Sequence, residues 1–153
     1  MIRAATPADI PALVALEADF PAEDRFDRRT WARLLRGQAS VLVEADEAGT
    51  LQAAAAILYR QGTGIARLYS ITVAAEARGK GLARKLLAAC EADALCRGAR
   101  AMRLEVRASN SSALRLYEQA GYRVFATSES YYPDGEAARR MEKVLIAPSD
   151  GAP

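Results

Sequence analysis

The residues best suited to binding an anion form a short stretch rich in glycine and positive charge. This stretch reads Arg78-Gly79-Lys80-Gly81-Leu82-Ala83-Arg84-Lys85 and leads into the longest predicted helix. Glycine lets backbone N–H groups come close to a ligand, and a helix N-terminus offers unpaired N–H donors and a partial positive charge. The pattern therefore predicts a phosphate-binding turn.

This turn differs from two common nucleotide-binding motifs. It lacks the Gly-Lys-Ser/Thr of a Walker P-loop and the Gly-x-Gly-x-x-Gly of a dinucleotide fold, which argues against nucleoside triphosphates and NAD. A basic, flexible turn that only begins a helix would have the same composition, and this alternative stays open. Histidine is absent from the sequence. Nucleophilic and zinc sites that need histidine are therefore excluded, and carboxylates, phenols, amines, thiols or backbone groups must carry any chemistry.

Apolar periodicity predicts the elements that would position this turn. Alternation predicts strands over Ile2–Ala5, Val41–Glu44, Leu51–Tyr59, Ala66–Val73, Arg100–Arg107, Tyr122–Thr127 and Arg139–Ile146. Capping residues and a 3.6-residue repeat predict helices from Thr6 to Asp19, over Thr30–Leu35, over Gly81–Arg97 and from Asn110 to Ala120. The order is that of a mixed α/β fold, with an antiparallel meander followed by a β-α-β crossover.

Composition limits the classes of partner. The chain is 51% hydrophobic and 26% charged with a net charge of +2, which suits one soluble domain and gives no support for nucleic acid as a partner. No apolar run approaches a membrane span, and the first twenty residues do not resemble a signal peptide, so we expect a cytoplasmic protein. Cys90 and Cys96 fall on different sides of one predicted helix, which argues against a disulfide between them.

Several segments, taken in order, resemble a known family. Ile71-Thr72-Val73 followed by Arg78 to Ala83 is similar to the strand and the Gln/Arg-x-x-Gly-x-Gly/Ala signature of the GNAT acyl-CoA N-acyltransferases. Later segments resemble the branch of this family that contains the bacterial ribosomal-protein alanine N-acetyltransferases (RimI-like). These segments are Leu104–Asn110, Leu116–Glu118, Gly121–Tyr122, Tyr131–Pro133 and Ala138–Met141.

The resemblance implies a fold and a domain layout. It implies a GNAT-type α/β fold, with a central, mostly antiparallel sheet of six to seven strands, a splayed parallel pair and about four helices. Residues 1-147 would form a single acyl-CoA N-acyltransferase domain, and we expect residues 148-153 to be a flexible tail. The protein would be a monomer or a homodimer.

The resemblance also implies a binding mode for acetyl-CoA, the expected co-substrate, without a metal. The backbone of the Ile71 strand would bind the pantetheine, and N–H groups of the glycine turn would bind the pyrophosphate. The expected cofactor-binding residues are Ile71, Thr72, Val73, Arg78, Gly79, Lys80, Gly81, Leu82, Ala83, Arg84, Asn110 and Tyr117.

Two residues match the catalytic positions of the family. Glu105 matches the general base that acts on the amine, and Tyr117 matches the acid that protonates the CoA sulfur. These roles suit ordinary protonation states, because a phenol has a pKa of about 10 and a glutamate one of about 4.3. Each residue has a structural alternative. Glu105 would be a solvent-facing residue paired with Arg103 or Arg107, Tyr117 a core residue, and Asn110 only a helix cap.

The expected acceptor is a primary amine, and we favour a protein N-terminal α-amine. Its pKa of about 8, against about 10.4 for lysine, makes the neutral nucleophile more available. Glu129, Tyr131 and Tyr132 are the expected substrate-binding residues, and Glu129 would favour a cationic group near the amine. Ser128 stands where the family branch commonly has arginine. A lysine side chain, a small-molecule amine and a non-catalytic acyl-CoA-binding module are the alternatives.

Overall fold

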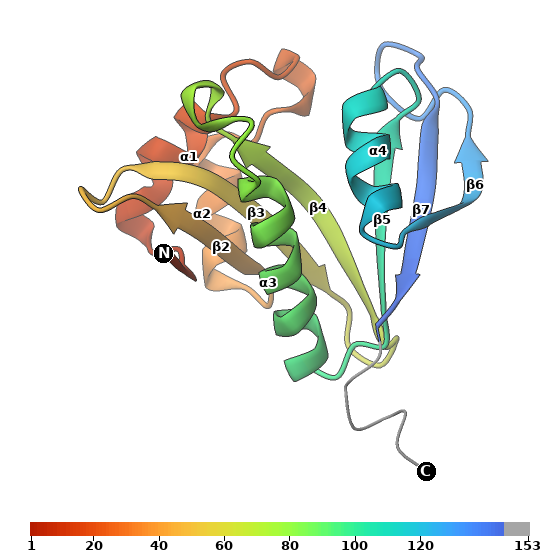
Figure 1. Cartoon of the computed structure of the whole chain (residues 1–153), viewed down its shortest axis with the longest axis horizontal. Helices are drawn as coiled ribbons and strands as arrows, with labels where there is room; N and C mark the ends of the chain where they lie inside the picture. The colour runs from red at the N-terminus through yellow and green to blue at the C-terminus, as the bar shows by residue number, and fades with distance from the viewer. Residues whose placement is uncertain (146–153) are drawn as a thin grey trace. The chain divides into compact units, whose positions relative to one another are not determined.

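The computed structural model describes residues 1–145 (Figure 1). Within them, the strands are β1 (Ile2–Ala4), β2 (Ser40–Ala45), β3 (Leu51–Tyr59), β4 (Ile65–Val73), β5 (Ala101–Arg107), β6 (Arg123–Ser128) and β7 (Ala138–Val144). The α-helices are α1 (Ile10–Leu16), α2 (Arg28–Arg36), α3 (Leu82–Cys96) and α4 (Ser111–Gln119), and the 3-10 turns are Pro7–Asp9, Ala22–Asp24 and Ala75–Ala77. The predicted tail at 148–153 and the predicted strand end at Ile146 lie outside the described residues.

The predicted mixed α/β fold is confirmed. The strands form one seven-stranded sheet in the order β1-β2-β3-β4-β5-β7-β6. Strands β4 and β5 run parallel, with Ile65–Arg67 paired to Ala101–Arg103, whereas β1–β2, β2–β3, β5–β7 and β6–β7 are antiparallel. Parallel neighbours need a crossover connection, and α3 supplies it. None of the helices described here is long and apolar enough to cross a membrane.

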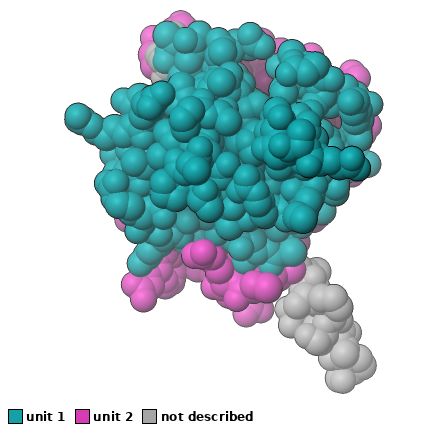
Figure 2. Space-filling model, turned by 90° about the vertical axis from the view of Figure 1, so that its left-hand side faces the viewer, with its two compact units in different colours: residues 1–59, 68–93 teal, residues 60–67, 94–153 magenta. Residues whose placement is uncertain are grey.

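The chain divides into two compact units, which Figure 2 colours teal and magenta. The first unit comprises residues 1–59 and 68–93, and the second comprises residues 60–67 and those from 94 onward. The first unit packs α1 and α2 against β2 and β3 through a cluster that includes Leu13, Trp31 and Val43. Four alanines of β3, Ala53 to Ala56, are all buried, so both faces of this strand are covered.

Helix α3 buries an apolar stripe, as its periodicity predicts. Leu86, Leu87 and Cys90 are at most 1% exposed. Asp93 on the same helix accepts hydrogen bonds of 2.6 Å from the hydroxyls of Ser40 and Tyr59, which ties α3 to β2 and β3. Burial raises the pKa of the Cys90 thiol to about 12, while Cys96 is exposed, and both cysteines are free. The two thiols thus differ in burial, as expected for residues on different sides of one helix.

The second unit shows a clean alternation along β5. Met102, Leu104 and Val106 are buried, which leaves Arg103, Glu105 and Arg107 to share the opposite face because successive strand residues point to opposite sides. Pairing with β7 sets Glu105 opposite Arg140 and Arg103 opposite Glu142.

The N-terminal helices differ from the prediction at their boundaries. Instead of one helix from Thr6 to Asp19, a 3-10 turn precedes α1, and α1 ends at Leu16. The next residue, Glu17, is buried and its carboxylate accepts the Phe26 N–H at 2.7 Å, so burial of this side chain accompanies the early end of the helix.

Helix α2 begins earlier than the predicted start at Thr30. Asp27 caps it by accepting the Thr30 N–H at 2.8 Å. An aspartate at the N-cap position satisfies one of the free N–H groups of the first turn.

Candidate active site

The glycine turn has the backbone conformation that its composition predicts. Gly79 and Gly81 have φ angles of 81° and 77°, a left-handed region that other residues rarely adopt. A Cβ atom at either position would meet no atom within 4 Å. The two glycines are therefore required by backbone conformation and not by crowding from neighbouring atoms.

The turn leads directly into the first hydrogen-bonded turn of α3. The Lys85 N–H donates to the Gly81 carbonyl at 3.1 Å. The N–H groups of Leu82 and Ala83 precede this first helical bond, so the helix itself supplies no acceptor for them. Groups of this kind can bind an anion at a helix N-terminus, and the binding of a phosphate here stays a prediction.

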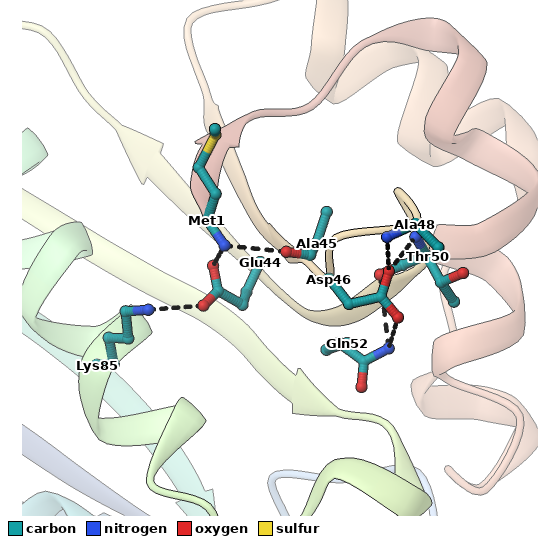
Figure 3. Close-up of polar contacts among 8 residues, drawn as sticks. All are labelled: Met1, Glu44, Ala45, Asp46, Ala48, Thr50, Gln52 and Lys85. Atoms are coloured by element: carbon teal, nitrogen blue, oxygen red, sulfur yellow. Dashed lines mark hydrogen bonds and ion pairs between the residues drawn. The ribbon is translucent and has the colours of Figure 1, made fainter.

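The charged side chains around the turn are partly engaged elsewhere. Lys85 donates to the Glu44 carboxylate at 2.7 Å, and the N-terminal ammonium of Met1 lies 2.7 Å from the other oxygen of Glu44 (Figure 3). Burial alone would raise the pKa of Glu44, but the two cations outweigh burial and lower it. The ammonium of Lys85 is therefore engaged by Glu44, which it shares with the ammonium of Met1.

Figure 3 also shows how the neighbouring hairpin turn is held. The Asp46 carboxylate accepts the N–H groups of Ala48 and Thr50 at 3.0 Å and 2.9 Å. These bonds close the turn between β2 and β3.

The predicted pantetheine-binding residues end β4. Thr72 is buried, whereas Ile71 and Val73 are partly exposed. The carbonyl of Val73 accepts a hydrogen bond of 3.3 Å from Arg78, and Arg78 also lies 3.7 Å from Asp19. One predicted cofactor residue thus contacts the backbone of another.

Glu105 lies in the second unit and is enclosed by arginines. Its carboxylate is 2.7 Å from Arg67 Nη2 and 3.6 Å from Arg140 Nε, and its side chain is only 10% exposed. The alternative that Glu105 faces solvent beside Arg103 or Arg107 is therefore wrong. Arg103 is paired with Glu142, and Arg107 is paired with Asp134 and Glu136.

Arg67 joins Glu105 to the predicted substrate-binding loop. It donates to the Tyr131 hydroxyl at 2.8 Å as well as to Glu105. Tyr131 packs edge to face on Tyr132 at 5.0 Å, and Arg107 stacks 4.1 Å from the centre of the Tyr132 ring. Tyr131 is therefore linked to Glu105 through Arg67, and Tyr132 packs on Tyr131, whereas Glu129 is exposed.

Tyr117 and Asn110 adopt the structural roles that were left open for them. Tyr117 on α4 is 6% exposed and packs edge to face on Tyr122 at 5.7 Å. The Asn110 side chain accepts the Ala113 N–H at 3.1 Å and so caps α4. These contacts are compatible with roles toward a ligand, and those roles stay predictions.

The comparison with family models decides the family. The model described as Acetyltransferase (GNAT) family matches residues 10–122. The chain belongs to the GNAT acetyltransferase family. The resemblance inferred from the sequence motifs is therefore confirmed.

The curated relatives that match this chain share one name. The [ribosomal protein bS18]-alanine N-acetyltransferase of Escherichia coli K12 is 38% identical over 82 residues, which is 54% of each chain. The present chain thus spans about half the length of the curated relatives it matches.

Solved structures of the family extend the likeness over the whole fold. The crystal structure of the ribosomal-protein-S18-alanine N-acetyltransferase from Escherichia coli has a TM-score of 0.84 at 27% identity, covering 100% of this chain and 98% of that one. A ribosomal-protein-alanine N-acetyltransferase from Brucella melitensis has a TM-score of 0.81 at 26% identity, covering 95% and 99%.

Sequence reasoning missed the two arginines that contact Glu105. Arg67 is 38 positions away from Glu105 along the chain, and Arg140 reaches it only through the β5–β7 register. The sequence does carry one signal, the alternation of residues along β7, which puts Arg140 and Glu142 on the same face of the strand. A correct register between β5 and β7 would then have set Arg140 opposite Glu105 and Glu142 opposite Arg103.

Proposed function

We propose that this GNAT family member is an acetyl-CoA-dependent N-acetyltransferase whose acceptor is a protein N-terminal α-amine. The observation that carries the proposal is the placement of Glu105, a nearly buried carboxylate joined through Arg67 to Tyr131. The names of the similar bacterial proteins, which describe acetylation of an alanine on a ribosomal protein, support this choice of acceptor.

In the proposed reaction the glycine turn binds the cofactor. The N–H groups from Gly79 to Arg84 would hold the pyrophosphate, and the backbone of Ile71, Thr72 and Val73 would hold the pantetheine. Lys80 and Arg78 would add positive charge, and Asn110 would contribute a further contact. The open space around Gly79 and Gly81 supports this role, because it leaves the backbone accessible to a phosphate.

Two side chains would perform the proton transfers. The neutral amine attacks the thioester carbonyl carbon, the C–S bond breaks, and an amide and a CoA thiolate result. Glu105 would take the proton that the amine loses, and the Tyr117 hydroxyl would give a proton to the sulfur. Glu129, Tyr131 and Tyr132 would line the acceptor side. The match of the family model to residues 10–122 supports one catalytic domain over 1-147.

An assay with a panel of acceptors tests this proposal. Acetyl-CoA turnover should be fastest with a peptide that has a free N-terminal alanine and much slower with the same peptide blocked at its N-terminus. A peptide whose only amine is a lysine side chain, and a polyamine, are the competing acceptors. Faster turnover of either competitor would contradict the choice of an α-amine, while turnover of none would contradict an enzymatic function.

The same preparation tests the remaining expectations about partners. Size measurement in solution should give a monomer or a homodimer, and titration with duplex DNA or RNA at physiological salt should show no binding.

We also propose a cytoplasmic location, because the relatives are named for a ribosomal substrate.

A further inference from the structure

The face of β5 that carries Glu105 also carries an arginine on each side of it. Arg103 and Arg107 share this face with Glu105 because they lie two positions before and two positions after it. Arg103 pairs with Glu142 and stacks on Phe125, so its partners lie on the strands β7 and β6. The partners of Arg107, by contrast, lie in residues 129–137, which we call the β6–β7 loop.

The side chain of Arg107 makes three contacts with the β6–β7 loop. Its Nη1 atom lies 2.7 Å from the Asp134 carboxylate and 3.0 Å from the Glu136 carboxylate. Its guanidinium carbon lies 4.1 Å from the centre of the Tyr132 ring. The side chain is only 15% exposed, so these ion pairs are less screened by solvent than pairs on an open surface. One guanidinium thus holds two carboxylates and one ring of the same loop.

Hydrogen bonds within the loop connect these contacts to Tyr132. The Tyr132 N–H donates to the Glu136 carbonyl at 3.1 Å, and the Gly135 N–H donates to the Tyr132 carbonyl at 2.8 Å. The Glu136 carboxylate also accepts the N–H of Ser109, just before α4, at 2.8 Å. A change in the position of Asp134 or Glu136 therefore also moves Tyr132.

The start of the loop is held by a second arginine. Ser130 has a φ of 51°, a conformation that costs energy in a residue other than glycine and persists where neighbouring contacts hold it. The next residue, Tyr131, accepts a hydrogen bond of 2.8 Å from Arg67, which also donates to Glu105 at 2.9 Å. The loop is thus fixed at two places, by Arg67 near its start and by Arg107 further along.

We propose that Arg107 is a positioning residue for the acceptor, because it fixes the β6–β7 loop with Tyr131 against Arg67. The inference rests on the proposed function, since it requires the acceptor to bind beside Tyr131 and Tyr132. Arg107 acts through the loop and not on the reacting atoms. Arginine suits this role because its planar group binds carboxylates through its edge and stacks on a ring through its face.

Steady-state kinetics of Arg107→Gln with an N-terminal alanine peptide tests the proposal. A loosened loop weakens acceptor binding equally in the ground state and the transition state, which raises KM and preserves kcat. We expect the acceptor KM to rise about tenfold, as for loss of one charge-assisted contact, while kcat changes less than about threefold. The KM for acetyl-CoA should stay native. Arg107→Lys should have a smaller effect, because it keeps the charge without the planar group.

Arg103→Gln is the matched control. It also removes an arginine that is ion-paired and stacked on a ring, at the mirror position beside Glu105. It should keep the native acceptor KM, because its partners lie outside the loop. Thermal unfolding of both variants measures the loss of stability that they share. An equal rise of the acceptor KM in Arg103→Gln overturns the proposal.

A variant changed on the loop side tests the same contact if Arg107→Gln does not fold. Asp134→Asn combined with Glu136→Gln removes both charges that face Arg107, and these side chains are 46% and 25% exposed. The amide oxygens still accept the N–H groups of Glu136 and Ser109 that the carboxylates bind. This double variant should raise the acceptor KM as Arg107→Gln does, and a native acceptor KM in it overturns the proposal.

A double-mutant cycle distinguishes positioning from a general loss of structure. Tyr131→Phe removes the hydroxyl that Arg67 binds and so releases the loop at its other fixed place. If Arg107 acts by holding Tyr131 there, Arg107→Gln should raise the acceptor KM of Tyr131→Phe by less than about twofold. Two independent effects would instead multiply.

The outcomes separate this inference from the proposed function. A native acceptor KM in folded Arg107→Gln, a parallel rise of both KM values, or effects that multiply in the cycle overturn the inference and leave the proposed function standing. Absence of turnover by the native enzyme with every acceptor overturns both.

Discussion

In the glycine turn, the groups that we propose to bind a ligand belong to the backbone, whereas around Glu105 they belong to side chains. The turn presents the N–H groups ahead of the first α3 hydrogen bond, and the neighbouring Lys85 is already bound to Glu44. Around Glu105, one carboxylate, two guanidiniums and a tyrosine hydroxyl meet from β4, β5, β7 and the loop after β6. The first region thus depends on local conformation and the second on long-range pairing.

This difference predicts how each region fails. At a site built from backbone groups, ligand binding should persist when nearby charges are removed. It should weaken when the φ angles of the backbone are disturbed. At a site built from side chains, removing one functional group should impair the chemical step that this group performs. The following changes test the contrast, beginning with the largest expected effect.

Removal of the Tyr117 hydroxyl should have the largest effect. Tyr117→Phe keeps the packing against Tyr122 but removes the proposed proton donor, and general acid catalysis is worth about 10²–10⁴ in rate. Turnover measured across a pH series should stay low throughout, because the missing proton is needed at the leaving sulfur. Native turnover in a folded Tyr117→Phe protein would contradict the acid role and show that Tyr117 serves only in packing.

Glu105→Gln should lower turnover by a comparable or somewhat smaller factor, about 10²-fold near neutral pH, and should show a different pH profile. The change keeps the shape of the side chain and removes the base, so the rate should recover in part as pH rises and free amine becomes available. The control is Glu142→Gln, which removes the carboxylate paired with Arg103 and should leave the pH profile unchanged. A Glu105→Gln profile parallel to the native one at the native rate excludes the base role.

Disturbing the glycine turn should weaken acetyl-CoA binding at least several-fold. Gly81→Val places a branched side chain at a φ of 77°, which strains the turn and puts a side chain into the open space beside its N–H groups. Gly49→Val is the matched control, because Gly49 has a φ of 87° and equally open surroundings. Calorimetric titration should show weaker binding in Gly81→Val alone; equal affinity in both variants removes the turn from the cofactor site.

Reversing the charge of Glu129 should alter acceptor use by a few-fold. Glu129→Lys should change the Michaelis constant for the acceptor and leave that for acetyl-CoA unchanged, since the residue belongs to the loop that adjoins Tyr131. Steady-state kinetics with each substrate varied in turn measures both constants. Equal changes in the two, or no change in either, argue against an acceptor-side position.

Loss of Lys85 should have the smallest effect on ligand binding. Because its ammonium is bound to Glu44, Lys85→Gln should change the acetyl-CoA dissociation constant by less than about threefold, while unfolding free energy falls by about 1 kcal/mol. The pKa of Glu44 is lowered in the folded protein, so this stabilisation is present above the ordinary glutamate pKa and is lost as pH falls through the folded value. The difference in unfolding free energy between Lys85→Gln and native protein, measured by chemical unfolding, should therefore disappear in acid. A large loss of acetyl-CoA affinity in Lys85→Gln would contradict a binding site built from backbone groups.

The same contrast explains how much the sequence could predict. The glycine turn was predictable because its signal is local, and the bounds of β3 were predicted as Leu51–Tyr59 because strong turn residues flank an apolar run. The Asp27 cap also had a local signal, an aspartate three positions before Thr30. By contrast, the partners of Glu105 depend on the pairing of β5 with β4 and β7. Alternation fixes which face a residue occupies but not its neighbour across the sheet.

The unequal burial of the two cysteines has a practical consequence. Cys90 is fully buried with a pKa raised to about 12, and Cys96 is exposed at the end of α3. A maleimide reacts with accessible thiolate, so it should label the folded chain at Cys96 alone. A fluorophore or spin label can thus be attached at one site without mutation. The slow appearance of a second label would then count how often the interior around Cys90 opens.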